Sequence, residues 1–410
     1  MTTTEPVDVK SAEDDLALEE RLVQFARDMR PELIERQAEA EANTFYTEAV
    51  HQKFQEAGLY KLFIPKAHGG YELPARAYYR VVMELARADM GTAWCFALSA
   101  NHALMFANWF PEEIHAEVYN NGDFRAASMY APSVFAEKTD GGYIVNGTVN
   151  YCSGIPYSTY FLGQARLEGT QPNGAPRLGV YMAPRETYTR LNDWGRTLGL
   201  KSSGSHSIRF ENAFLPERFM LEDVDMITVG FDGDSPGSKA YNNPMYSGRH
   251  GSSFAMILGA LCVGGGYNAL DEFENQMRSR KTTVPPFVPR TEDPDFLRYF
   301  GNAKVRLSLA EASIMNAVDQ WTQATIDNVS GVEPFTVAKD NLLGGIGREV
   351  MIYVWDTVDA LYQVIGSSAS YDGERFQRIY RDLAQAAGHR NPQLRDFSYR
   401  MIAKDTLGLN

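Results

Sequence analysis

The sequence predicts a mainly α-helical protein with a central β-domain, because the spacing of its hydrophobic residues changes twice along the 410-residue chain. Apolar side chains recur at helical spacing in residues 1–122. They alternate in residues 123–232, where Gly-rich turns separate strand-like runs. Helical spacing returns, in longer segments, in residues 233–410. We therefore expect an N-terminal helical domain, a β-domain and a C-terminal helical domain.

The N-terminal domain is expected to hold several amphipathic helices. Leu22, Phe25 and Met29 mark the buried side of the first one. Two further helical patterns follow, around 45–57 and 75–90. The apolar run from Gly91 to Phe110 then predicts one buried helix, with His102 in its interior.

The β-domain is expected to be a compact antiparallel barrel or sandwich. Its strand-like runs are GGYIVNGTVNYCSG, YFLGQARL, RLGVYMAP and SHSIRFENAFLP. Turn residues separate these runs, as is typical of short strands joined by tight connections.

The C-terminal domain has the pattern of a four-helix bundle. Its helical segments are 247–280, 296–328, 335–366 and 374–387. Two segments rich in Pro, Gly and Asp, 230–244 and 282–295, adjoin the first helix. Loops of this length are often lids or partner-binding segments, and equally often mobile surface loops.

Composition narrows the class of protein. The formal net charge of −13 argues against a nucleic-acid partner, because phosphates repel such a surface. Cys95, Cys152 and Cys262 show neither metal-ligand spacing nor a disulfide pattern, which fits a reducing cytoplasm. The N-terminus lacks the pattern of a signal peptide, and the apolar run 254–266 is too short and Gly-rich to span a bilayer. We expect a cytoplasmic protein without a bound metal and without a membrane partner.

Four segments carry a resemblance to a known family. They are VNGTVNYCSG at 145–154, WGRTLGLKSSGSHSIRFENAFLPE at 194–217, ALDEFENQMRSRKT at 269–282 and QVIGSSASYDGERFQRIYRDLAQ at 363–385. In this order they resemble motifs of the acyl-CoA dehydrogenases. The first motif ends in that family with Trp-Ile-Thr beside the flavin ring, where this chain has Tyr151, Cys152 and Ser153.

The chain departs from the dehydrogenases at their catalytic carboxylate. No acid follows Asp382 in the sequence LAQAAGHRN, and none lies between Asp234 and Asp271. Without such a base, proton removal from carbon is slow. His389 stands in this region, and AASMYAPS at 126–133 replaces the family's Thr-Glu-Pro-Gly.

These departures resemble the flavin monooxygenase branch of the fold, which includes p-hydroxyphenylacetate hydroxylase and dibenzothiophene monooxygenase. The resemblance implies the oxygenase component of a two-component system, which uses reduced flavin (FADH2 or FMNH2) and O2 through a flavin hydroperoxide. It implies hydroxylation of an aromatic or heteroaromatic small molecule such as a phenol, an indole or a related acid. Alternatives are an N- or S-oxygenase, an acyl-CoA dehydrogenase with a relocated base, and a scaffold without catalysis.

The resemblance also assigns three candidate catalytic residues. Ser153 would bond flavin N5, although a turn serine is the simpler interpretation. His389 would act as an acid or base, since an unperturbed imidazole has a pKa of about 6.5; the alternative is a helix-capping histidine. His102 would contact the substrate, unless it is a core histidine bonded to a backbone carbonyl.

The remaining assignments concern the cofactor and partners. The candidate flavin-binding residues are Tyr151, Cys152, Ser153, Ser128, Ser203, Gly204 and Ser205, with Arg280 for the phosphate. Tyr151 is otherwise a core residue, the 203–205 segment a strand turn, and Arg280 a solvated charge. GGGYNAL at 264–270 lies inside a helical pattern and not after a strand, so no dinucleotide loop is predicted. We therefore expect a separate NAD(P)H:flavin reductase as partner, and a homotetramer by resemblance.

Overall fold

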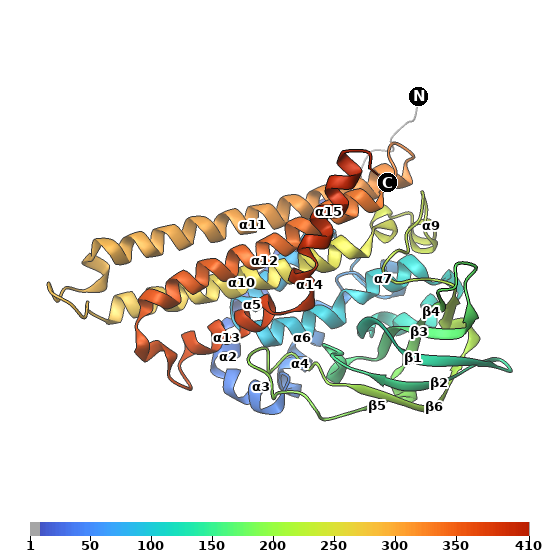
Figure 1. Cartoon of the computed structure of the whole chain (residues 1–410), viewed down its shortest axis with the longest axis horizontal. Helices are drawn as coiled ribbons and strands as arrows, with labels where there is room; N and C mark the ends of the chain where they lie inside the picture. Colours follow the sequence, from blue (N-terminus) through green and yellow to red (C-terminus); the bar gives the residue numbers. More distant parts are fainter. Residues whose placement is uncertain (1–8, 410) are drawn as a thin grey trace.

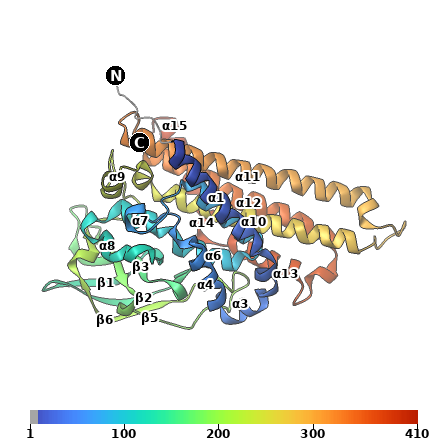
Figure 2. The ribbon, with the colours of Figure 1, turned by 180° about the vertical axis from the view of Figure 1, so that it is seen from behind.

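Long helices cover one side of a β-sheet in the computed structural model of the chain, which describes residues 9–409. The C-terminal helices form the outer layer, the N-terminal helices lie between, and the sheet lies opposite (Figure 1). The view from behind shows the first helix crossing the long helices obliquely (Figure 2). The expected mainly α fold with a central sheet is confirmed.

The N-terminal domain is a set of short helices. They are α1 (Val9–Asp28), α2 (Arg30–Glu35), α3 (Gln37–Asn43), α4 (Glu48–Ala57), α5 (Ala75–Ala86), α6 (Met90–Ala100), α7 (His102–Trp109) and α8 (His115–Tyr119). The expectation of one helix over 91–110 was wrong, because the helix breaks at Asn101. The carboxylate of Asp89 caps α6 by accepting the backbone N–H of Thr92 at 2.9 Å. His102 is consequently the first residue of α7 and not the interior of a longer helix.

The central sheet has seven strands in the order β5-β6-β2-β1-β3-β4-β7. Their bounds are β1 (Ala126–Thr139), β2 (Gly142–Val149), β3 (Tyr160–Thr170), β4 (Pro176–Pro184), β5 (Thr189–Arg190), β6 (Ile208–Pro216) and β7 (Met220–Glu222). The β1–β2 pair is an antiparallel hairpin, in which Lys138 lies opposite Tyr143.

One strand pair departs from the expected antiparallel arrangement, because β1 and β3 are parallel, with Ala126 opposite Tyr160. A parallel pair needs a connection that returns along the sheet. β2 runs back along the sheet, and the segment 150–159, here called the return loop, then joins the end of β2 to the start of β3 on the other side of β1. This loop contains the predicted flavin motif. Within β1 the pairing register shifts between Met129 and Val134, and Tyr130 lies in this irregular stretch.

The C-terminal domain confirms the predicted bundle. Its long helices are α10 (His250–Ser279), α11 (Pro294–Val329), α12 (Val337–Ile365) and α13 (Arg375–Ala387), followed by α14 (Arg390–Gln393) and α15 (Arg395–Thr406). α10 packs against α11, α12, α13 and α5. By length and composition α10 alone, among the described helices, is apolar enough to cross a membrane, yet 89% of its apolar window is buried inside the protein. Its apolar surface is thus covered by the protein's own helices.

Three consecutive glycines let neighbouring helices approach α10 closely. A Cβ atom on Gly264 would lie 2.3 Å from the carbonyl oxygen of Met83 in α5. A Cβ on Gly265 would lie 2.9 Å from Sδ of Met90, and one on Gly266 would lie 2.5 Å from Leu307 in α11. The Gly-rich segment is therefore part of a helix, as its hydrophobic pattern predicts, and it serves close packing.

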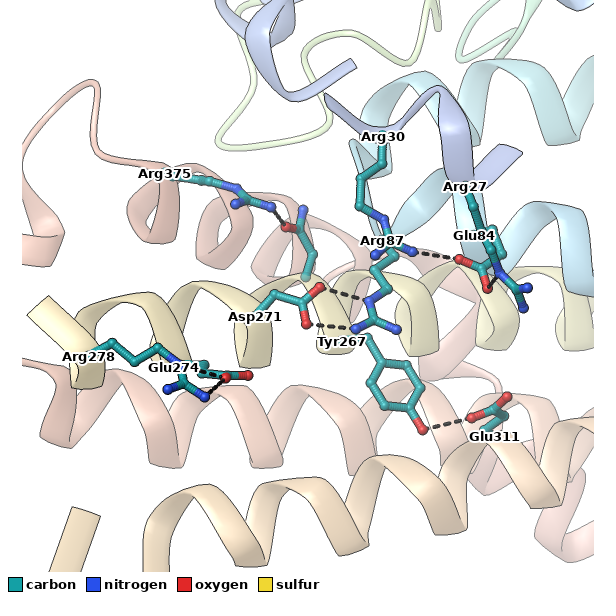
Figure 3. A network of polar contacts seen from close by, with 11 residues as sticks. Arg27, Arg30, Glu84, Arg87, Tyr267, Asp271, Glu274, Arg278, Glu311 and Arg375 are labelled. Atoms are coloured by element: carbon teal, nitrogen blue, oxygen red, sulfur yellow. Dashed lines mark hydrogen bonds and ion pairs between the residues drawn. The ribbon is translucent and has the colours of Figure 1, made fainter. Parts of the chain in front are cut away.

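A polar network joins the N-terminal helices to the bundle (Figure 3). The guanidinium of Arg87, which follows α5, donates two hydrogen bonds of 2.7 Å to the carboxylate of Asp271 in α10. Glu84 accepts hydrogen bonds from both Arg27 and Arg30. Paired donors of this kind fix orientation as well as attraction. The network therefore holds α1, α2 and α5 at one angle to α10.

The two predicted loops contain more structure than expected. Helix α9 (Pro236–Tyr241) lies inside the segment 230–244 and begins with a capping box between Ser235 and Ser238. Gly237 in α9 packs so closely that a Cβ would lie 2.5 Å from the carbonyl oxygen of Ala107 in α7. In the second segment, Asp293 caps the start of α11. The first segment is therefore packed against α7, and the second is hydrogen-bonded to the start of α11.

Candidate active site

Three serine hydroxyls form a chain beside a tryptophan at the return loop after β2. Oγ of Ser153 lies 2.7 Å from Oγ of Ser205, which in turn lies 2.7 Å from Oγ of Ser203. The indole N–H of Trp94, in α6, donates to Oγ of Ser153 at 3.2 Å. Ser153 is partly exposed, whereas Ser203, Ser205 and Trp94 are buried. A buried donor and a buried hydroxyl thus hold one accessible hydroxyl in a fixed orientation.

His389 packs against the same tryptophan. The rings of Trp94 and His389 are 5.6 Å apart and meet edge to face at 64°. Trp94 therefore brings together Ser153 and His389, which are more than 230 positions apart in the sequence. The shared neighbour defines one candidate site for the two predicted residues.

His389 differs from the freely titrating imidazole that the sequence predicts. Burial lowers its pKa to about 4, so the ring is neutral near pH 7. Its Nδ1 accepts the backbone N–H of Asn391 at 3.1 Å and caps α14. A neutral ring that accepts at Nδ1 carries its proton on Nε2. His389 is therefore a hydrogen-bond donor at Nε2, as well as a helix cap.

His102 has the opposite tautomer. Its Nδ1 lies 2.5 Å from the carbonyl oxygen of Ala126, which can only accept, so Nδ1 carries the proton. Burial lowers the pKa of His102 to about 4, so its Nε2 has a free lone pair near neutral pH. The backbone bond agrees with the core-histidine interpretation, and it leaves Nε2 as an acceptor.

A cluster of aromatic rings, which includes His102, surrounds His250 where α7, β1 and the start of α10 meet. The ring of His250 lies 6.1 Å from that of His102. Tyr130 and Phe254 lie 5.7 and 5.8 Å from His250, and Trp109 lies at 6.0 Å. His102, His250 and Trp109 are buried, so this aromatic cluster lies in the interior of the protein.

Tyr151 has a strained backbone and an exposed ring. Its φ of 62° lies in the left-handed region, which is rare for a bulky aromatic residue. The side chain is 65% exposed, and its ring meets Trp194 edge to face at 5.9 Å. Strain of this kind in a ligand-binding protein often marks a functional position.

The other predicted flavin residues divide into two groups. Cys152 is fully buried, and its thiol donates to the carbonyl of Val149 at 3.4 Å, so its side chain belongs to the core. The N–H of Gly204 donates to the carbonyl of Thr44 and is thus already used. Oγ of Ser128, by contrast, is buried and has no hydrogen-bond partner among the described residues.

Arg280 lies apart from these residues. It follows the last residue of α10 and donates a hydrogen bond to Oγ of Ser368. Gly265, which packs against Met90 at the start of α6, precedes it by fifteen residues. At 1.5 Å per residue, Arg280 is about 20 Å further along the helix. The structure does not bring Arg280 and Ser153 of one chain together.

Two buried carboxyl groups hold the segment that carries the serine chain. Oδ1 of Asp382 accepts the backbone N–H of Leu200 at 2.6 Å. Asp89 accepts the hydroxyl of Ser202 at 3.3 Å. Burial, followed by the negative charge of Asp89, raises the pKa of Asp382 to about 8. The hydrogen bonds of these two carboxyl groups are thus made with Leu200 and Ser202 of this loop and with Thr92 of α6.

Two residues of this region, Trp94 and His250, were not predicted from the sequence. Trp94 lies in an entirely buried helix, where a tryptophan is most simply a core residue. His250 begins a long buried helix, and only its position next to Gly251 and Ser252 distinguishes it. Contacts between distant segments reveal both residues, and such contacts leave no local pattern.

Comparison with known proteins identifies the family. Residues 12–118 match the acyl-CoA dehydrogenase N-terminal domain, and residues 256–393 match the acyl-CoA dehydrogenase C-terminal domain. The chain belongs to the acyl-CoA dehydrogenase family, in its branch of flavin-dependent monooxygenases.

Two relatives represent this branch. The flavin-dependent monooxygenase oxygenase subunit HsaA of Rhodococcus jostii is 27% identical over 88% of this chain and 91% of its own length. The oxygenase component of p-hydroxyphenylacetate 3-hydroxylase of Acinetobacter baumannii is 25% identical over 87% of this chain and 81% of its own.

Solved structures share the fold. XiaF from Streptomyces sp., in complex with FADH2 and glycerol, has a TM-score of 0.84 at 20% identity, covering 99% of this chain and 98% of XiaF. The 3-HSA hydroxylase from Rhodococcus sp. RHA1 has a TM-score of 0.83 at 23% identity, covering 95% of this chain and 97% of its own.

The residues at the site fit the ring of a flavin better than its phosphate. Tyr151 offers an exposed aromatic face, Ser153 an oriented hydroxyl and His389 an N–H donor. The predicted phosphate ligand, Arg280, is at the far end of α10. Among the described residues, no group of His, Cys, Asp and Glu side chains could hold a metal ion.

Proposed function

We propose that this chain is the oxygenase component of a two-component monooxygenase that hydroxylates an aromatic small molecule. The observation that carries the proposal is the arrangement around Trp94, which holds a hydroxyl and a neutral imidazole at one place. The carboxyl groups of Asp89 and Asp382 accept hydrogen bonds from the backbone amides of Thr92 and Leu200. No described carboxyl group contacts Ser153, so the dehydrogenase alternative lacks its base.

Reduced flavin, when bound, supplies the electrons that activate dioxygen for insertion of one oxygen atom into the substrate. The residues of this chain orient the ring, donate hydrogen bonds and exclude water. Ser153 would offer its hydroxyl to N5 of a bound flavin, and its contacts with Trp94 and Ser205 hold that hydroxyl in place. His389 donates from Nε2 and remains neutral near pH 7.

His102 is the group in the aromatic cluster that can accept a hydrogen bond from the substrate. Its Nε2 lone pair can receive the hydrogen bond of a phenol and so increase electron density on the aromatic ring. Tyr130, Trp109 and Phe254 supply the apolar surround. Relatives with similar sequences are named as hydroxylases of p-hydroxyphenylacetate and of resorcinol, which are phenols.

The proposal includes two partners. A separate NAD(P)H:flavin reductase supplies reduced FAD or FMN, and relatives are named oxygenase components of such systems. The second partner is further copies of this chain, as a homotetramer. A stripe of exposed apolar residues on α11, formed by Leu297, Val305 and Leu309, supports association through the bundle.

Rapid mixing of the protein and reduced flavin with oxygen tests the proposal. With phenol present, we expect hydroxylated product and slower release of hydrogen peroxide than from free reduced flavin. Ser153→Ala should release more peroxide per flavin oxidised, and Ser153→Thr, which keeps a hydroxyl, should restore coupling. Oxidation at the rate of free flavin, or reduction of added flavin by an acyl-CoA, would reject the proposal.

A further inference from the structure

Helix α13 holds the loop before β6 on both sides of Gly199. On one side, the guanidinium of Arg381 donates a hydrogen bond to the carbonyl of Leu198 at 2.9 Å. On the other side, Oδ1 of Asp382 accepts the backbone N–H of Leu200 at 2.6 Å. A Cβ atom on Gly199 would clash with the carbonyl oxygen of Arg381, so the loop lies directly on the helix. Two consecutive residues of α13 therefore fix the peptide groups that flank Gly199.

This contact determines where the loop turns toward the serine chain. Leu200 has a φ of 51°, in the left-handed region that an L-residue rarely adopts, and the buried carboxyl group of α13 stabilises it there. The carbonyl of Leu200 accepts the N–H of Ser203 at 3.1 Å, and Oγ of Ser203 lies 2.7 Å from Oγ of Ser205. The carbonyl of Ser203 accepts the N–H of Gly154 in the return loop at 3.3 Å. The turn at Leu200 thus sets the position of the serine hydroxyls and of the return loop.

A second buried carboxyl group, that of Asp89, holds the same loop from the side of α6. It accepts the hydroxyl of Ser202 at 3.3 Å, the N–H of Thr92 at 2.9 Å and the side-chain amide of Gln37 at 3.3 Å. Burial raises the pKa of Asp89, whereas the hydrogen bond from Thr92 favours its ionised form. Burial, followed by the negative charge of Asp89, raises the pKa of Asp382 to about 8. Near pH 7 the two carboxyl groups therefore carry one negative charge, and ionisation of Asp382 would place two like charges beside one short loop.

The other charged groups that face Asp382 come from α3 and from α13 itself. Glu41 of α3 raises the pKa of this carboxyl group, and Arg381 lowers it. Arg381 and Arg378 both pair with Glu41, at 3.1 and 3.4 Å, so these charges largely balance one another. The helices on the remaining sides, α10 and α12, place Gly265 against Leu383 and Asp359 against Tyr380. The repulsion between Asp382 and Asp89 is therefore the interaction that changes with pH near 8.

From this geometry we propose that Asp382 is a positioning residue for the oxygenase reaction, because its hold on Leu200 sets the place of the hydroxyl of Ser153. This inference rests on the proposed function and adds a residue that touches neither flavin nor substrate. It also makes coupling depend on pH. When Asp382 ionises, repulsion from Asp89 displaces the loop, and more of the reduced flavin reacts with O2 to give oxidised flavin and hydrogen peroxide in place of product.

Hydrogen exchange followed by mass spectrometry on the flavin-free, full-length protein tests the positioning directly. Asp382→Ala removes the acceptor of the Leu200 N–H, so amides in 199–206 and in the return loop should exchange about three- to tenfold faster. Asp382→Asn keeps an acceptor oxygen and cannot ionise, so it should exchange as the wild type does at pH 7. Between pH 7 and 9, after correction for base catalysis of exchange, only the wild type should accelerate.

The yield of hydrogen peroxide per product, with phenol as substrate, gives a second measurement. Asp382→Ala should raise this yield about three- to tenfold at pH 7. From pH 7 to 9 the yield should rise more in the wild type than in Asp382→Asn, and the comparison removes any pH effect of the flavin itself. Asp293→Ala is the matched control, because it removes a carboxylate that accepts the N–H of Phe296 at the start of α11. This control should be destabilised and yet keep the coupling of the wild type.

Two results would overturn the inference: unchanged exchange of the return loop in Asp382→Ala, or the same pH course of coupling in the wild type and Asp382→Asn. The second comparison still decides if Asp382→Ala fails to fold. Absence of hydroxylated product from the wild type would reject the proposed function and leave the exchange result standing. Normal product formation with coupling that neither substitution of Asp382 alters would reject only the positioning role.

Discussion

The indole N–H of Trp94 donates to Oγ of Ser153 at 3.2 Å, while the same ring meets His389 edge to face at 5.6 Å. One side chain of α6 thus positions two residues from the return loop and from the C-terminal domain. Three separately folded parts of the chain must be assembled before this arrangement exists. The candidate site is therefore a product of the tertiary structure.

Replacing Trp94 tests whether this arrangement matters for coupling. Trp94→Phe keeps a flat ring beside His389 but removes the donor to Ser153. We expect about three- to tenfold more hydrogen peroxide per product, because one hydrogen bond contributes about 0.5–1.5 kcal/mol. The measurement is peroxide and product per flavin oxidised. Trp355→Phe, at a partly exposed ring beside Tyr380, is the matched control, and equal coupling in the two variants would dismiss the role of Trp94.

Replacing Tyr151 tests whether backbone strain is retained for binding. An L-residue in the left-handed region is destabilised by about 1–2 kcal/mol, and asparagine tolerates that region better. Tyr151→Asn should therefore raise the free energy of unfolding by about 0.5–1 kcal/mol and weaken binding of reduced flavin severalfold. Urea denaturation and anaerobic flavin titration measure the two effects. Full flavin affinity in the variant would show that the ring makes no contact.

The raised pKa of Asp382 predicts a dependence of stability on pH. In the folded protein this carboxyl group titrates at about 8, compared with 3.8 ordinarily, so between these values the folded state binds the extra proton. The free energy of unfolding should therefore fall as pH rises toward and through 8. His102 and His389, with pKa values lowered to about 4, act in the opposite sense, but only below pH 6.5.

Comparing the wild type with a variant that lacks this carboxyl group between pH 6.5 and 8 separates its effect from that of the histidines, which both proteins share. Asp382→Asn keeps an oxygen for the N–H of Leu200 and cannot ionise. Between these two pH values we expect the wild type to lose about 1.7 kcal/mol of stability more than the variant does, because the folded carboxyl group titrates at about 8. Urea denaturation at both pH values measures this difference, and equal losses would mean that Asp382 titrates elsewhere.

The polar network of Figure 3 predicts unequal effects of two similar substitutions. Asp271 accepts two hydrogen bonds from a partly buried Arg87, and Asp271→Asn should lower stability by about 1–2 kcal/mol. Asp319 pairs with Arg76 on the surface, where both side chains are about half exposed. Asp319→Asn should change stability by less than about 0.5 kcal/mol. Thermal unfolding compares them, and equal effects would contradict the assigned role of the network.

The sequence predicted the layers of the fold well, because hydrophobic periodicity reports burial along a helix or strand. The four long C-terminal helices lie within a few residues of their expected bounds. The break at Asn101 and the parallel β1–β3 pair were not predicted. Both depend on how distant segments pack, and neither a proline nor a glycine marks the break.

The candidate site was predicted less completely. The motif alignment pointed to Ser153 and His389, and the structure brings both to Trp94. The sequence could not predict the tautomers of His102 and His389. They depend on hydrogen bonds with the carbonyl of Ala126 in β1 and with the amide of Asn391 in α14. The functional roles of these residues remain predictions.

The glycines at 264–266 constrain evolution as well as packing. A methyl group at each position would strike a different neighbour, so helix α10 can neither rotate nor slide without breaking several contacts at once. His250 at one end and Arg280 at the other are thereby kept at a constant spacing, about 45 Å for a straight helix of this length. Side chains larger than glycine should therefore be excluded at these three positions, because moving α10 to fit them would disturb its contacts with α5, α6 and α11 together.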